Sequence, residues 1–214
     1  MHPLSHYIRQ ELEGLYSKAE ISVLSQLIFE EVCGRSCSGI TTCKNTHLSD
    51  EERRKTQDIV RRLKNDEPIQ YVLGHTEFYG LPFVVTPDVL IPRPETEELV
   101  EWVLAENTCD DCTLLDVGTG SGCIAIALGK KIPHRDVHAW DISEDALNVA
   151  SLNALRNGVD IRFSLRDIFQ PVEPCPLFDV IVSNPPYVAM SEKADMERSV
   201  IDFEPHEALF VPDE

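Results

Sequence analysis

The sequence contains no apolar run near the ~20 residues that a membrane-spanning helix needs. Its first segment, residues 1–16, is interrupted by charged side chains and lacks the pattern of a secretory signal peptide. Both absences argue against a membrane protein and against a secreted one. We therefore expect a cytoplasmic protein with no membrane partner.

Basic residues are scarce, because 19 lysines and arginines stand against 37 aspartates and glutamates, and the formal net charge is −18. A chain this acidic repels phosphate backbones unless its basic residues gather in one patch. The densest basic stretch, residues 53–64, alternates with acidic side chains and is typical of the solvated face of a helix. We therefore expect no direct contact with nucleic acid, and basic proteins are the more natural partners.

The cysteines follow no pattern of a disulfide framework or a metal site. All seven occur without a secretion signal and their number is odd, which favours free thiols. Cys109 and Cys112 have the spacing of a metal or redox pair, but no second pair follows at zinc spacing. A second group has irregular gaps that match no common zinc pattern and consists of Cys33, Cys37, Cys43 and His47. We expect no bound metal.

The length of 214 residues and the apolar fraction of 43% suit one ordinary domain plus a small one. In the N-terminal part apolar side chains recur at helical spacing, most clearly from Ile21 to Val32. Ser49 and Glu52 have the spacing of a capping box, which predicts the start of a further helix. Residues 1–70 are therefore predicted to form a helical domain.

Two different patterns follow the helical region. Residues 71–94 hold short β-rich runs on either side of Gly80-Leu-Pro82, which predicts a β-hairpin connector. In residues 95–214 helical and strand patterns alternate, and strands are expected at 113–117, 136–140, 161–165 and 178–183. Such alternation predicts an α/β fold in which helices cover both faces of a parallel sheet.

The end of the sequence is predicted to be a polar tail without a further helix or strand. The fourth strand, residues 178–183, would then be an apolar edge whose backbone groups have no partner, and such edges pair with other chains. We therefore expect a C-terminally incomplete domain that can self-associate through this edge.

A glycine-rich segment, Leu115-Asp-Val-Gly-Thr-Gly-Ser-Gly122, ends a predicted strand and opens a predicted helix. Glycines let the backbone approach a ligand closely, and a helix N-terminus offers free N–H donors. A tight turn between strand and helix would explain the same residues without a ligand. We expect a nucleotide-like cofactor here, bound by Gly118, Thr119, Gly120, Ser121 and Gly122.

Further residues extend the predicted cofactor site. Asp141 ends the next strand, where a carboxylate accepts hydrogen bonds from ribose hydroxyls in Rossmann-type sites. The glycines are spaced G-x-G-x-G rather than the G-x-G-x-x-G of dinucleotide sites, which favours S-adenosylmethionine. Ile168 follows the third strand and is placed to line an adenine pocket. Its neighbour Phe169, taken by itself, is more typical of a core aromatic residue than of a ligand contact.

A second motif, Ser183-Asn-Pro-Pro-Tyr187, follows the fourth strand at the edge where open α/β sheets bind ligands. Asn184 can present its side-chain oxygen both to the cofactor region and to a substrate, and the prolines leave an adjacent backbone carbonyl free because they have no N–H. Two acceptors match one NH₂ group. A proline-rich turn after a strand is the alternative. The predicted catalytic residues are Asn184, Pro185, Pro186 and Tyr187.

This motif suits methyl transfer to a planar amide. An amide nitrogen is a poor nucleophile because its lone pair is delocalised, and two hydrogen bonds that favour a pyramidal nitrogen would return electron density to it. The ring of Tyr187 can stack on the flat amide and hold it in line with a methyl group. No general base is required, because the methylated amide is acidic enough to lose its proton to water.

Three segments together resemble one known family. They are Asp116-Val-Gly-Thr-Gly-Ser-Gly122, Asn184-Pro-Pro-Tyr187, and Phe78-Tyr-Gly-Leu-Pro-Phe83 leading into Ile91-Pro-Arg-Pro-Glu-Thr-Glu97. Over its whole length the chain is similar to the release-factor glutamine methyltransferases, the HemK/PrmC family. Amino-methyltransferases of adenine and guanine share the Asn-Pro-Pro-Tyr motif, so the specificity of the resemblance comes from residues 91–97.

The resemblance implies a Rossmann-like class I methyltransferase domain with S-adenosylmethionine as its cofactor. It implies a cofactor loop at Gly118–Gly122, ribose recognition by Asp141, an adenine contact near Ile168 and amide recognition by Asn184–Tyr187. The implied substrate is the glutamine of the Gly-Gly-Gln loop in a peptide chain release factor, which the helical domain helps to grip. Family members continue for further strands and helices that complete the sheet.

The residues leave three other functions open. A ribosomal-protein glutamine methyltransferase shares the core of the domain but resembles Pro94–Glu97 less well. A nucleic-acid amino-methyltransferase is disfavoured by the acidic charge. An inactive, truncated fragment that only binds its partner would fit an incomplete sheet.

Overall fold

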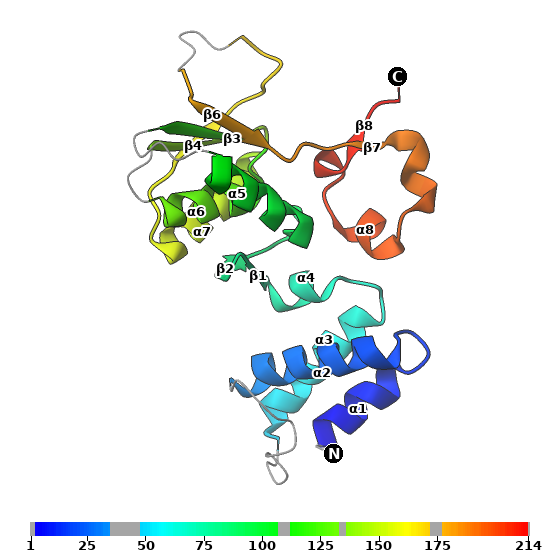
Figure 1. Cartoon of the computed structure of the whole chain (residues 1–214). Coiled ribbons are helices and arrows are strands. Elements are labelled where there is room, and N and C mark those ends of the chain that lie inside the picture. The colour runs from blue at the N-terminus through cyan, green and yellow to red at the C-terminus, as the bar shows by residue number, and fades with distance from the viewer. Residues whose placement is uncertain (1–2, 35–47, 107–111, 133–135, 172–176, 214) are drawn as a thin grey trace. The chain divides into compact units, whose positions relative to one another are not determined.

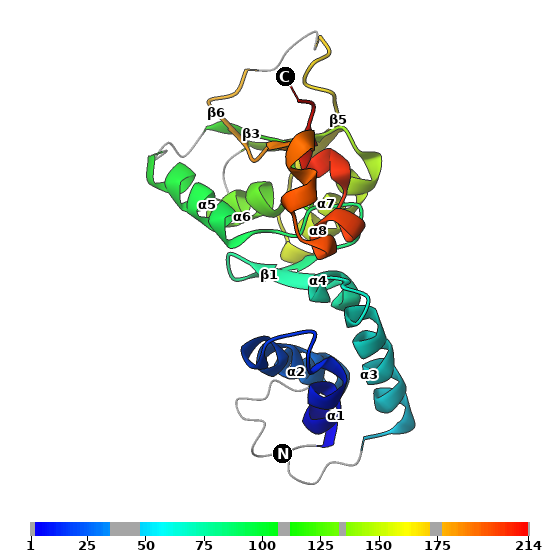
Figure 2. The same cartoon turned by 90° about the vertical axis from the view of Figure 1, so that its right-hand side faces the viewer.

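The computed structural model describes residues 3–34, 48–106, 112–132, 136–171 and 177–213. The chain divides into two compact units, Met1–Leu73 and Gly74–Glu214, whose elements are labelled in Figures 1 and 2. Each unit encloses its own cluster of buried apolar side chains.

The first unit is helical, as predicted, and consists of α1 (Pro3–Leu12), α2 (Lys18–Cys33), α3 (Asp50–Leu63) and α4 (Ile69–Leu73). The predicted capping box at Ser49 is confirmed, because Ser49 Oγ accepts from Glu52 N at 3.1 Å and the Glu52 carboxylate accepts from Ser49 N. The apolar faces of the helices meet in a core that includes Ile8, Leu12, Ile28, Val60 and Leu63. The short helix α4 was not predicted.

The second unit begins with the predicted hairpin, formed by β1 (His75–Phe78) and β2 (Leu81–Val84). Its position is fixed by the buried Asn153 of α7 (Glu144–Asn157): Asn153 Oδ1 accepts from Val84 N at 2.7 Å, and its Nδ2 donates to Val84 O and to Ser121 O. The segment expected as a connector therefore packs as part of the second unit.

The predicted parallel sheet is confirmed and contains β3 (Thr113–Val117), β4 (Asp136–Asp141), β5 (Arg162–Leu165) and β6 (Val180–Ser183) in the order β5-β4-β3-β6. The chain runs outward from β3 to β5 and then returns to the other side of β3. This reversal lies between β3 and β6, where the carboxyl ends of an open sheet bind ligands. Within the described ranges no strand pairs with the outer side of β6.

The three helices that pack near the sheet lie together on one face (Figure 1), namely α5 (Pro94–Glu106), α6 (Cys123–Lys131) and α7. The expectation of helices on both faces was therefore wrong for the described part of the chain. The opposite face carries Leu115 and Trp140, and the ring of Phe178 packs on Trp140 with ring centroids 5.6 Å apart. A strand buried by a loop and one buried by a helix have the same apolar sequence, so the pattern could not distinguish them.

Residues 188–213 form a further small substructure (Figures 1 and 2). It comprises β7 (Val188–Ala189), the 3-10 helix η1 (Met190–Asp195), α8 (Arg198–Phe203), the 3-10 helix η2 (His206–Ala208) and β8 (Phe210–Val211), and β7 pairs with β8 in parallel. The expectation of a polar tail without helix or strand was wrong. These elements are two to six residues long, which is too short to show a hydrophobic period.

Candidate active site

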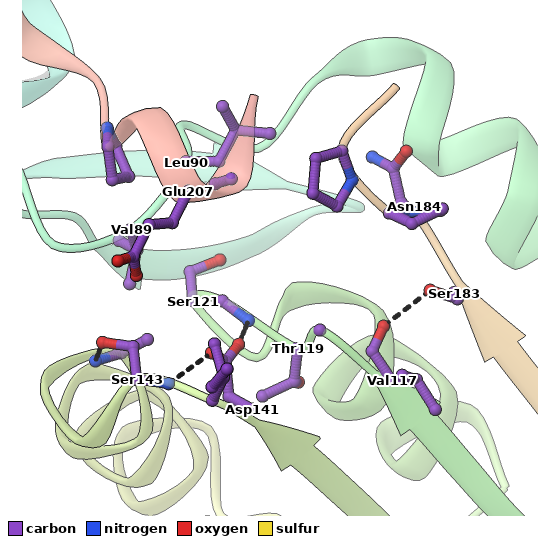
Figure 3. A pocket seen from close by; sticks show the side chains of 18 of the residues that line it. Val89, Leu90, Val117, Thr119, Ser121, Asp141, Ser143, Ser183, Asn184 and Glu207 are labelled. Atoms are coloured by element: carbon purple, nitrogen blue, oxygen red, sulfur yellow. Dashed lines mark hydrogen bonds between the residues drawn. The ribbon is translucent and has the colours of Figure 1, made fainter. Parts of the chain in front are cut away.

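A cavity of about 400 Å³ opens at the carboxyl ends of β3, β4 and β6 in the second unit (Figure 3). Segments far apart in the sequence line it: the stretch before α5, the loops after these strands, and the segment around η2. A volume of this size is typical of pockets for small organic ligands.

The cavity brings together most of the residues that the sequence singled out. The glycine loop contributes Gly118, Thr119, Gly120 and Ser121, and the other lining residues among them are Asp141, Ile168, Asn184, Pro185 and Pro186. Gly122 and Tyr187 are not among the lining residues. Tyr187 is 77% exposed.

Gly122 contributes to packing between helices. A Cβ at this position would lie 2.9 Å from Ile126 Cδ1 and 3.2 Å from the Cβ of Ala150, so a larger residue would push α7 away from α6. Gly118 and Gly120 differ from it, because a Cβ on either meets nothing within 4 Å. Their φ angles of +71° and +55° still require glycine, and the space beside them is open to a ligand.

Asp141 holds the glycine loop in place. Its Oδ2 accepts from Gly120 N at 2.8 Å, and its Oδ1 accepts from Ser143 N at 2.9 Å (Figure 3). The backbone of β4 adds to this, since Trp140 O accepts from Gly118 N and Thr119 N. The sequence predicted a ligand contact for Asp141 but not this bracing role. Each carboxylate oxygen retains a lone pair, so the two roles are compatible.

Asp116 lies beneath the loop and is fully buried. Its Oδ2 accepts from Thr119 Oγ1 at 2.7 Å and from Ala125 N in the first turn of α6, so the carboxylate caps that helix. Its Oδ1 has no partner among the described residues. Burial raises the pKa of Asp116 to about 6, against the lowering effect of its hydrogen bonds.

Of the two cysteine patterns, only Cys33 and Cys112 lie within the described residues, which also include Cys123 beside the glycine loop. Burial, with the nearby Asp116 as a second cause, raises the pKa of the Cys123 thiol to about 12, so it stays protonated and is a poor nucleophile. No group of three His, Cys, Asp or Glu side chains in the described ranges could hold a metal ion. Outside those ranges lie Cys37, Cys43, His47 and Cys109.

Asn184 is oriented by a residue that the sequence analysis did not assign. Its Nδ2 donates to Oγ1 of the buried Thr96, in the first turn of α5, at 3.3 Å. With its nitrogen engaged, the amide presents its oxygen as the remaining acceptor. Just below, Ser183 Oγ donates to Val117 O at 2.7 Å and ties the ends of β6 and β3 together (Figure 3). Thr96 belongs to the segment 91–97, which was the only signal that could have indicated it.

The cavity has an excess of negative charge. Arg93 and Arg166 are its two arginines, and Arg166 lies over the ring of Trp140 at 5.3 Å. Against them stand five acidic side chains, which are Asp88, Asp141, Asp145, Asp167 and Glu207. This lining favours a ligand that carries positive charge, such as a sulfonium with an ammonium group.

Two family models match the chain. The model "Methyltransferase small domain" matches residues 96–203, and the model "PrmC N-terminal domain" matches residues 4–74.

In the described part of the chain no helix is both long enough and apolar enough to span a membrane.

Two curated relatives carry the same name. The release factor glutamine methyltransferase of Bacteroides thetaiotaomicron is 46% identical over 216 residues, which cover 100% of this chain and 77% of the relative. That of Flavobacterium psychrophilum is 42% identical and covers 95% of this chain and 73% of the relative. The chain thus spans about three quarters of the length of these relatives.

Among solved structures, the catalytic domain of hMettl16 in complex with an RNA hairpin has a TM-score of 0.51 and 15% identity, with 89% of this chain and 67% of that one covered. At this identity the likeness concerns the fold alone. The two family models, the relatives and the glycine loop that faces the cavity agree on one assignment. The chain belongs to the release factor glutamine methyltransferases, a family of S-adenosylmethionine-dependent enzymes.

Proposed function

We propose that this chain transfers a methyl group from S-adenosylmethionine to the side-chain amide of a glutamine in a peptide chain release factor, the glutamine of its Gly-Gly-Gln loop. One observation carries the proposal: the glycine loop and the Asn184-Pro-Pro186 motif line the same cavity. The names of the relatives support the choice of substrate over other amides.

The open glycine loop and the acidic lining of the cavity support this choice of cofactor. S-adenosylmethionine, when bound, supplies an electrophilic methyl group on a positively charged sulfur. The space beside Gly118 and Gly120 is open to the cofactor, and the acidic side chains of the lining complement its positive charge. We propose that the loop residues Gly118 to Ser121 and Asp141 hold it, with Ile168 beside the adenine.

Asn184 and Pro185 are proposed to bind the substrate amide. The free oxygen of Asn184 and the backbone carbonyl of Pro185 would accept from the two hydrogens of the NH₂ group, and this pairing returns electron density to the nitrogen. Tyr187, whose ring is exposed in the free protein, would stack on the flat amide as the substrate enters. Water suffices to take the proton that leaves.

The helical unit is proposed to contribute to recognition of the release factor. Its residues 4–74 match the PrmC N-terminal domain, and the net charge of −18 favours a basic protein over RNA. Since release factors act on ribosomes, we propose that the reaction takes place in the cytoplasm.

The direct test is mass spectrometry of a release factor after incubation with this chain and the cofactor. We expect the mass of one methyl group on the glutamine of the Gly-Gly-Gln loop. A release factor with alanine in place of that glutamine is the control. Methylation of RNA or of a ribosomal protein, with an unmodified release factor, would reverse the proposal.

Two substitutions separate the proposed roles. Asn184→Ala removes an acceptor for the substrate and should lower kcat by about 10 to 100-fold, since an unpaired buried polar group costs about 1–3 kcal/mol. Asp141→Ala releases Gly120 and should mainly weaken cofactor binding in calorimetry. Equal loss of cofactor affinity in both variants would contradict this division of roles.

We also propose that the outer side of β6 can pair with a second copy of the chain. Among the described strands β6 pairs only with β3, and its Ile181 is 64% exposed. Sedimentation velocity should detect concentration-dependent dimers that Ile181→Lys reduces. Leu155→Lys changes a side chain that is 79% exposed on α7 and serves as the control. A monomer at all concentrations would contradict the pairing.

A further inference from the structure

Two segments that are remote in the sequence form one wall of the cavity. Residues 87–93, which precede α5, contribute Val89 and Leu90, and the segment around η2 contributes Pro205, Glu207 and Ala208. Figure 3 shows Val89, Leu90 and Glu207 close together at this end of the cavity. The shape of this wall therefore depends on what holds the two segments against each other.

An ion pair between a partly exposed arginine and a buried glutamate joins them. Arg93 Nη2 lies 2.5 Å from Glu204 Oε1, although the two residues are 111 positions apart. The other oxygen, Glu204 Oε2, accepts from Ile91 N at 3.4 Å. The Glu204 side chain is only 1% exposed, whereas that of Arg93 is 36% exposed. Both oxygens of a deeply buried carboxylate are thus engaged by the segment that precedes α5.

The burial of Glu204 makes this contact decisive for the position of η2. A buried carboxylate without a partner is strongly unfavourable, so Arg93 stabilises the buried position of Glu204 by compensating its charge. Glu204 is the C-cap of α8 and is followed at once by Pro205 and by η2. Its anchoring therefore sets where Pro205, Glu207 and Ala208 stand in the wall.

The same short turn also controls the proposed substrate amide site. Thr96 N donates to Arg93 O at 3.0 Å, and this turn opens α5. From it, Thr96 orients Asn184 and Arg93 holds Glu204. The glycine loop is braced separately, by Asp141 and Asp116. A change at Arg93 should therefore affect the substrate side of the cavity more than the cofactor side.

We infer that Arg93 and Glu204 are positioning residues: their ion pair holds residues 205–208 as one wall of the cavity that Asn184 also lines, and this wall helps to confine the glutamine-bearing loop. The part of this inference that concerns the substrate rests on the proposed function. The part that concerns the wall rests on the contacts alone.

The test compares Arg93→Met, Arg93→Lys, Glu204→Gln and, as a control in the same segment, Arg198→Met, whose side chain is exposed on α8. Three measurements are made on each: steady-state kinetics with a release factor for KM and kcat, calorimetry for cofactor affinity, and amide hydrogen exchange in residues 188–213. Glu204→Gln keeps the side-chain shape without a buried charge, so it tests the wall even if Arg93→Met fails to fold.

We expect Arg93→Met to raise KM for the release factor about tenfold or more, because the buried carboxylate of Glu204 loses its charged partner. Cofactor affinity should change by no more than about twofold, which separates substrate positioning from general damage. Glu204→Gln should shift KM in the same direction, Arg93→Lys should restore most of it, and Arg198→Met should leave it unchanged. Amides in residues 188–213 should exchange faster in Arg93→Met and Glu204→Gln.

Unchanged exchange in Glu204→Gln would overturn the inference, and so would a loss of cofactor affinity as large as the rise in KM. Failure of Arg93→Lys to restore KM would likewise count against the ion pair. Should the unmodified chain methylate no release factor, the proposed function fails, and exchange alone then decides whether the pair holds the wall.

Discussion

At the scale of single residues, the direction in which Asn184 points depends on a neighbour. A side-chain amide can turn over and exchange its oxygen with its nitrogen, which here would replace an acceptor for the substrate by a donor. In the structure Thr96 Oγ1 accepts from Asn184 Nδ2 at 3.3 Å, which leaves the side-chain oxygen of Asn184 as the acceptor. This contact supports the orientation that the proposed chemistry needs.

Thr96→Val, which keeps the shape and removes the hydroxyl, should lower kcat by about fivefold, since a hydrogen bond of this kind contributes about 1 kcal/mol. Cofactor affinity should stay as it is. Thr96→Ser should recover most of the activity, because serine restores the acceptor. Steady-state kinetics and calorimetry on the three proteins provide the measurement, and a fully active Thr96→Val would show that Asn184 is oriented otherwise.

Asp116 should make the free energy of unfolding depend on pH. Its pKa is raised by burial from 3.8 to about 6, so between these values the folded state binds more protons than the unfolded state. Stability contributed at this site therefore falls as pH rises from about 4 to about 6 and stays reduced above that. Urea unfolding at several pH values should show this decline, and Asp116→Asn, which cannot titrate, should lose it. Equal pH slopes in both proteins would contradict the burial argument.

At the scale of elements, local patterns predicted the helices and the sheet strands well. Ser49 and Glu52 begin α3 as expected, and the apolar run at 113–117 is β3. These signals succeed because capping and side-chain period act within a few residues of the chain. Family resemblance then placed the glycine loop and Asn184 near each other, and the structure puts both on one cavity.

The features that sequence reasoning missed depend on contacts between distant segments. Arg93 and Glu204 have no local signature, because the two residues are 111 positions apart and meet only in the folded chain. Asp141 would end a strand whether it binds a ligand or braces the glycine loop. The sequence therefore could not predict that Asp141 accepts a hydrogen bond from Gly120 N. The Ser183 and Thr96 contacts are likewise products of the packing of β6 and α5.

Asn153 is predicted to be the main attachment of the hairpin to the rest of its unit. It is fully buried and makes hydrogen bonds to Val84 N, Val84 O and Ser121 O. Asn153→Ala leaves these groups unpaired and should lower the free energy of unfolding by about 2–4 kcal/mol. Leu155→Ala, on the same helix but 79% exposed, should change it by no more than about 0.5 kcal/mol. Urea midpoints that drop equally in both variants would refute the attachment.

At the scale of the whole molecule, the two units have separate cores. The buried cluster of the first unit lies between Leu4 and Val72, and that of the second between Phe78 and Val182. Every residue that lines the cavity belongs to the second unit. A ligand of the cavity should therefore stabilise the second unit directly and leave the first unit to unfold at its own midpoint.

The two tryptophans make this division measurable, since Trp102 and Trp140 both lie in the second unit, while circular dichroism reports helices of both. With S-adenosylmethionine at 100 times its Kd, the fluorescence transition should gain about 2.7 kcal/mol, the mass-action effect of a ligand that binds only the folded form. The first unit contains no tryptophan, so its unfolding changes the circular dichroism but not the fluorescence. The midpoint of that part of the circular dichroism transition should stay unchanged. Asp141→Ala should reduce the gain, because it releases the glycine loop. If the cofactor moved both transitions together, the units would be unfolding as one, and recognition of a release factor by the helical unit would then be coupled to an occupied cavity.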